Sequence, residues 1–109
     1  AGVQGVPEAK PKSEWNHADL AAHLKTKGVV VRVGSGGIAN VIVPGSLASE
    51  FIDDANGEHV MCFLTQTDRQ AHEAAASIGA GATPWGKFVI SDRHRENAGL
   101  YNRILAALR

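Results

Sequence analysis

Cysteine is nearly absent from this sequence, because Cys62 is the only one among 109 residues. A single thiol forms no intramolecular disulfide and supplies no cysteine-rich metal site. Cys62 lies between Met61 and Phe63 in an apolar run, so we expect a small buried side chain rather than a nucleophile. The lack of disulfides favours a reducing compartment and predicts a cytoplasmic protein, although a signal peptide removed earlier would leave no trace.

The sequence also lacks a net charge, because eleven basic residues balance eleven acidic ones. No overall field therefore attracts nucleic acid or an anionic membrane surface. Aromatic residues make up only 6% of the chain, which leaves few rings to stack on exposed bases. No apolar run approaches the roughly 20 residues that cross a bilayer. We expect neither a nucleic-acid partner nor a membrane partner.

Motifs of catalytic sites are missing as well. No G-x-S-x-G occurs, so serine hydrolysis has no support. His72 and Glu73 resemble the start of a zinc-protease helix, but the position of the second histidine is occupied by Ala76. Distant histidines such as His59 and His94 could still converge in the fold. The sequence predicts no catalytic residue, no metal site and no cofactor, and it favours a protein that is not an enzyme.

What the sequence does contain is the composition of an ordinary globular domain, with 44% hydrophobic and 20% charged residues. Residues 1–12 carry two prolines and two glycines without apolar periodicity, which predicts a flexible leader or linker. Residues 13–109 are predicted to form a single domain with one core. Such a leader is typical of a module from a longer protein, although a mature N-terminus would look the same. Alanine-rich, lysine-poor usage suggests a bacterial source.

Local patterns predict an α+β fold, in which Asn16 caps the first helix and Gly28 ends it. We expect helices at residues 16–27, 67–78 and 95–108 and strands at residues 29–33, 38–43, 60–65 and 87–90, with residues 47–52 ambiguous between a strand and a helical turn. The predicted architecture is a two-layer sandwich with a mixed sheet of about four or five strands. Its three helices pack mainly on one face, in the order α-β-β-(β)-β-α-β-α.

Two connections define the expected topology. The glycines within residues 34–37 can adopt the positive φ angles of a turn, which predicts a β-hairpin between the first two strands. The succession of strand, helix and strand across residues 60–90 predicts a right-handed parallel crossover.

Residues 34–39 also match the G-x-G-x-x-A form of a dinucleotide-binding fingerprint. That chemistry needs a helix directly after the glycines, whereas the residues that follow are β-branched and end at Pro44. The hairpin is therefore favoured. A small-ligand-binding domain or minor enzyme that uses residues 34–37 is the alternative function, and its candidate ligand-binding residues are Ser35, Gly36, Asn40 and His59.

Charge is distributed unevenly along the chain. Residues 45–73 hold six acidic and one basic residue, which sum to −5, while residues 74–109 hold five basic and two acidic residues, which sum to +3. The basic C-terminal part could face the acidic segment 50–58 of a partner or of a second copy. Trp85, between Pro84 and Gly86, packs at a core edge or marks an interface.

The leading hypothesis is a non-enzymatic protein-interaction or regulatory module within a larger bacterial protein. It would bind a protein partner or associate with itself, and its candidate interaction residues are Trp85, Arg93, Arg95 and Arg103.

Overall fold

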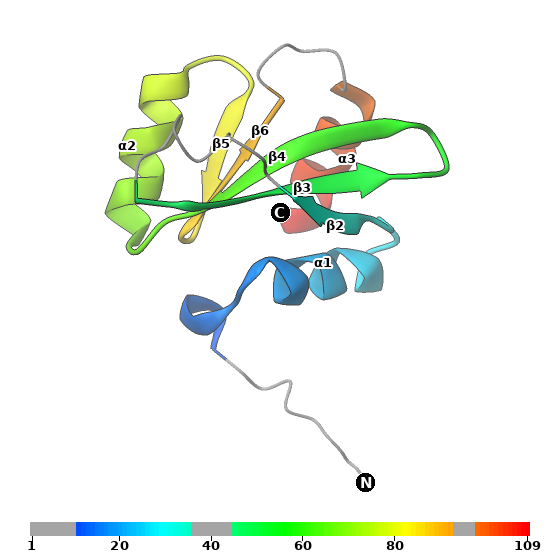
Figure 1. Cartoon of the computed structure of the whole chain (residues 1–109), viewed down its shortest axis with the longest axis horizontal. Helices are drawn as coiled ribbons and strands as arrows, with labels where there is room; N and C mark the ends of the chain where they lie inside the picture. The colour runs from blue at the N-terminus through cyan, green and yellow to red at the C-terminus, as the bar shows by residue number, and fades with distance from the viewer. Residues whose placement is uncertain (1–10, 36–44, 93–97) are drawn as a thin grey trace, which may run out of the picture.

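The computed structural model describes residues 11–35, 45–92 and 98–109 (Figure 1). Its elements, in chain order, are the 3₁₀ turn η2 (Lys12–Glu14), α1 (His17–Thr26), β2 (Arg32–Ser35), β3 (Leu47–Asp53), β4 (Glu58–Leu64), α2 (Asp68–Ile78), β5 (Ala82–Trp85), β6 (Phe88–Ser91) and α3 (Ala98–Leu108). The predicted α+β class and the predicted order of helices and strands are confirmed.

The five strands form one sheet in the order β2-β3-β4-β6-β5, and every neighbouring pair is antiparallel, so the described sheet is antiparallel where a mixed sheet was predicted. The segment of ambiguous type, residues 47–52, lies in β3 and pairs with β2, where Val33 faces Phe51. The second strand of the expected hairpin, residues 38–43, lies outside the described residues.

The predicted parallel pairing of residues 60–65 with residues 87–90 is wrong, because β4 and β6 run antiparallel. The chain leaves α2 into β5, a strand that the sequence did not indicate, and a tight turn then reverses it into β6. Gly86, at φ +58°, occupies that turn. Since β4 and β5 are each antiparallel to β6, they run in the same direction. The crossover therefore exists but passes over one strand.

Pro84 explains why β5 was missed and where it can lie. Proline cannot donate to a ladder and is tolerated on edge strands with its nitrogen turned outward. Asp92 N donates to Gly81 O at 2.7 Å, and because hydrogen-bonded pairs alternate, the nitrogens of Ala82 and Pro84 point away from β6. Ala82 N is satisfied locally by Gly79 O at 3.2 Å. The outer edge of β5 thus offers no free N–H group.

The helices divide between the two faces of the sheet. Two of the three share one face, and the larger core cluster joins Leu20 and Leu24 of α1 and Leu100 and Ile104 of α3 to strand residues that include Cys62. The remaining helix, α2, packs on the opposite face, where Ala71, Ala75, Phe63 and Val89 form a second cluster. Figure 1 shows α2 beside β5 and apart from α1 and α3. A two-layer arrangement therefore holds for the α1 and α3 side, and α2 adds a partial third layer.

The predicted burial of Cys62 is confirmed, because its side chain is fully buried. Burial raises the pKa of the thiol well above its usual range. A protonated, inaccessible sulfur is a poor nucleophile, so this residue belongs to the core.

Candidate functional site

A buried histidine lies at the start of α1, where Asn16 and Asp19 form a reciprocal capping box. The His17 ring packs edge-on against Phe51 and Phe88, with ring centroids 6.5 and 6.1 Å away. Its Nε2 atom donates to Cys62 O at 3.0 Å, which requires the tautomer protonated at Nε2. No local pattern indicated this role, because the partner is a backbone carbonyl 45 residues away.

Burial lowers the pKa of His17, an effect only partly offset by the hydrogen bonds to the backbone of Cys62 and Leu47. The unfolded chain takes up this proton near the ordinary value of about 6.5, while the folded chain resists it. We expect the free energy of unfolding to fall as the pH drops from 7 to 5 and this contribution to level off below the folded pKa.

Substitution of His17 by glutamine tests the expected pH dependence, because an amide can still donate to Cys62 O but does not titrate. Urea denaturation at a series of pH values should show a smaller loss of stability for the variant than for the wild type between pH 7 and pH 5. Equal losses in both proteins would show that His17 is not the source of the pH dependence.

Trp85, the first of the predicted interaction residues, is half-buried in a cluster of rings. Its ring centroid lies 5.9 Å from that of Trp15 and 6.0 Å from that of His23, which is stacked on it. Lys12 Nζ lies over the same ring, 4.2 Å from its centroid, and forms a cation–π contact. The Nε1 atom of Trp85 donates to Leu108 O at 3.1 Å. The turn η2, the strand β5 and the end of α3 therefore meet at this side chain.

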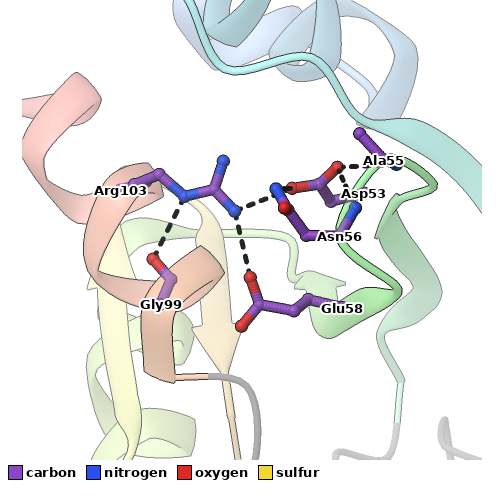
Figure 2. A network of polar contacts seen from close by, with 6 residues as sticks. All are labelled: Asp53, Ala55, Asn56, Glu58, Gly99 and Arg103. Atoms are coloured by element: carbon purple, nitrogen blue, oxygen red, sulfur yellow. Dashed lines mark hydrogen bonds and ion pairs between the residues drawn. The ribbon is translucent and has the colours of Figure 1, made fainter.

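Arg103 lies on α3 and contacts the acidic turn between β3 and β4 of its own chain (Figure 2). Its Nη2 atom lies 2.7 Å from Asp53 Oδ2 and 3.1 Å from Glu58 Oε1. Its Nε atom donates to Gly99 O at 3.4 Å. A methyl group on Gly99 would come within 3.1 Å of Glu58 Oε2, so glycine here lets α3 approach the carboxylate. The charge complementarity that we expected between two chains is thus met within one.

Asp53 is the most heavily bonded member of this network. Its Oδ1 atom accepts from the backbone nitrogens of Ala55 and Asn56 at 3.1 and 3.3 Å, and Oδ2 accepts from Asn56 Nδ2 at 2.8 Å as well as from Arg103. The bond from Arg103, followed by that from Asn56, lowers the pKa of Asp53 to about 2. Each oxygen already accepts two hydrogen bonds, which indicates a structural carboxylate rather than a proton carrier.

Of the four predicted ligand-binding residues, the structure describes Ser35 and His59. Ser35 lies in β2 opposite Ser49, whereas His59 lies in β4 opposite Ile52. His59 Nδ1 forms an ion-pair contact with Glu50 Oε2 at 2.8 Å. Gly36 and Asn40 lie outside the described residues, as do the predicted interaction residues Arg93 and Arg95. The ligand-binding role of the glycine segment stays a prediction.

Two absences hold for residues 11–35, 45–92 and 98–109. No three histidine, cysteine, aspartate or glutamate side chains in these ranges are grouped as metal ligands would be. No helix in the same ranges has the length and apolar character needed to cross a bilayer.

Comparison with known proteins gives no family to which this fold can be assigned, since no protein-family model, no curated protein and no solved structure matches the chain.

Proposed function

We propose that this chain is a non-enzymatic protein-interaction module that binds its partner through the β2 side of the sheet. The observation that carries the proposal is the distribution of exposed apolar side chains. Among the described residues the large exposed ones are Val30, Val33 and Leu47, with exposed fractions of 65%, 38% and 66%. Val30 lies two residues before the start of β2, Val33 lies in β2, and Leu47 begins the neighbouring β3. All three lie in or near the two strands at this side of the sheet, and exposed apolar side chains are typical contacts of a binding surface.

The opposite edge of the sheet, formed by β5, is less suited to binding, and this supports the assignment of the binding surface to the β2 side. Of the two outward nitrogens of β5, that of Pro84 carries no hydrogen and that of Ala82 donates to Gly79 O. The ring of Trp85 packs against Trp15 and His23. The β5 edge is therefore closed to strand pairing through its N–H groups. The proposal keeps the interaction function predicted from the sequence and moves its centre away from Trp85.

The compartment and the source belong to this proposal too. We place the module in the cytoplasm of a bacterial cell, as part of a larger protein. Its free, fully buried Cys62 needs no oxidising environment.

Leucine and valine on this surface should carry the binding energy. Burying one such side chain contributes about 1.5–3 kcal/mol, and its replacement by lysine should reduce the affinity for the partner by about tenfold or more. The change tested is Leu47→Lys, alone and together with Val33→Lys. The measurement is quantitative mass spectrometry of the proteins that the immobilised chain captures from an extract of its source cells.

Ala76→Lys provides the matched control, because Ala76 is exposed on α2, which packs on the other face of the sheet. We expect one set of proteins to be retained by the wild type and the control and lost by the β2-side variants. Equal capture by all variants, or capture of nothing by the wild type, would contradict the proposed function.

A further inference from the structure

The connection between α1 and β2 runs between two grooves of opposite character. The first, which we call the basic groove, has a volume of about 440 Å³ and is lined by the cationic side chains Lys27, Arg103 and Arg109 and by the apolar residues Val29, Ala106 and Ala107. No acidic residue lines it. Because Arg103 is already paired with Asp53 and Glu58, a carboxylate from outside the chain would meet the charges of Lys27 and Arg109 in this groove.

The second groove, which we call the acidic groove, has a volume of about 180 Å³. Asp53 and Asp54 line it together with Arg32 and with the apolar side chains Val30, Val31 and Ile52. Arg32 forms two hydrogen bonds to Asp54, each 3.0 Å long, with both side chains more than half exposed. Arg32 balances the charge of Asp54 and Arg103 that of Asp53, but the Asp54 side chain is 64% exposed, so its carboxylate stays accessible to a further cation.

The two grooves adjoin. Val29 lines the basic groove, and the next residue, Val30, lines the acidic groove. The ion pair between Arg103 and Asp53 also links them, because each groove contains one member of that pair. Val30 stands at their border with 65% of its surface exposed. The surface therefore passes from cations through an exposed apolar side chain to carboxylates.

An order of cation, apolar centre and carboxylate is self-complementary under a two-fold rotation. In an isologous dimer each contact occurs twice, so the cations of one copy meet the carboxylates of the other on both sides of the axis. We infer that a second copy of this chain docks on the connection between α1 and β2, with Val30 at the axis and Lys27 of each copy facing Asp54 of the other. This inference rests on the proposed interaction function and names one partner for it.

The apolar contact and the exposed charge pairs at this surface indicate a weak, reversible dimer. Apolar contact between the two exposed Val30 side chains supplies the attraction, while the exposed charge pairs determine orientation and encounter more than affinity. Arg103 and Asp53 keep their internal ion pair, so docking leaves neither charge unpaired. Because the new charge pairs lie near solvent, association should weaken as salt is added.

Sedimentation velocity over about three decades of concentration, up to about 1 mM, measures the dimer directly. Val30→Lys should raise the dissociation constant at least tenfold, since it places two like charges at the axis. Lys27→Glu and Asp54→Lys should each weaken the dimer, because each creates two repulsive contacts. The double variant Lys27→Glu/Asp54→Lys should restore it, since every intermolecular pair is again of opposite charge.

Arg69→Glu is the matched control, with the same change of charge at a residue of α2 that is 87% exposed. It should leave the dissociation constant unchanged. A wild type that stays monomeric throughout, or a dimer that does not respond to Val30→Lys, would overturn the inference. So would a double variant no stronger than its single parents. Capture of other proteins through Leu47 is measured separately, so the dimer can fail while the proposed function stands, and the reverse also holds.

Discussion

Trp85→Ala is expected to lower the free energy of unfolding by about 3 kcal/mol, since truncating a large aromatic side chain in a packed cluster leaves a cavity. The loss combines several contacts: the rings of Trp15 and His23, the ammonium of Lys12 and the hydrogen bond to Leu108 O. Urea denaturation followed by circular dichroism measures the change.

Trp85→Phe separates the ring from its hydrogen bond. Phenylalanine keeps an aromatic face for stacking but removes the N–H donor, and the net loss for such a bond is about 1 kcal/mol. A change of less than about 1 kcal/mol for Trp85→Ala would contradict the structural role and would revive Trp85 as an interaction anchor. Binding assays on this variant therefore need a check that the protein is folded.

Arg103→Met is expected to lower the melting temperature by on the order of 10 °C. The side chain of Asp53 is only 6% exposed, and removal of Arg103 leaves its charge without the partner that contributes most to its low pKa. Glu58 loses the same partner. Methionine keeps much of the aliphatic stem, so the change reports mainly on charge.

The pH dependence gives this prediction a second readout. Asp53 has its pKa lowered to about 2 in the folded protein, so the stability it contributes is complete above the ordinary value and is lost as the pH falls from about 4 through 2. The difference in melting temperature between wild type and Arg103→Met should therefore shrink over that interval. Arg69→Met, which removes an exposed i,i+4 pair with Glu73, should change the melting temperature by no more than about 2 °C. Equal changes of melting temperature in the two variants would show that the Asp53 network stabilises the fold no more than an exposed ion pair does.

Much of the fold could be predicted because its signals are local. Asn16 caps α1 as expected, and its reciprocal hydrogen bonds with Asp19 are 3.0 and 2.8 Å long. Thr67 Oγ1 accepts from Gln70 N at 3.1 Å and caps α2, and the side chain of Gln70 accepts from Gln66 N at 3.0 Å. Caps and apolar periodicity depend on neighbours a few residues apart, so the sequence shows them directly.

The missed strand and the wrong pairing have one cause. Pro84 argues against a central strand, and without β5 the chain seemed to pass from α2 directly into β6. Only knowledge that this segment lies at the sheet edge makes proline acceptable there. The strand order is a property of the whole sheet and cannot be obtained from a short window.

The candidate site depended even more on distant contacts. Arg103 and Asp53 are 50 residues apart, and nothing near either residue distinguishes a partner within the chain from a partner in another molecule. The uneven charge was a correct signal of attraction between the two segments, but composition does not say which copy supplies which charge. His17 was missed for a related reason, because its ring meets a carbonyl that any residue could provide.

The closed outer edge of β5 also limits what kinds of assembly this domain can enter. A sheet grows into a fibre only if each added molecule presents two open edges, one to join and one to be joined. The outer edge of β5 has no free donor, because Pro84 lacks an N–H group and Ala82 N donates to Gly79 O. Each molecule can therefore contribute at most one edge. Strand-to-strand association through the N–H groups of the described sheet therefore cannot continue beyond a pair of molecules.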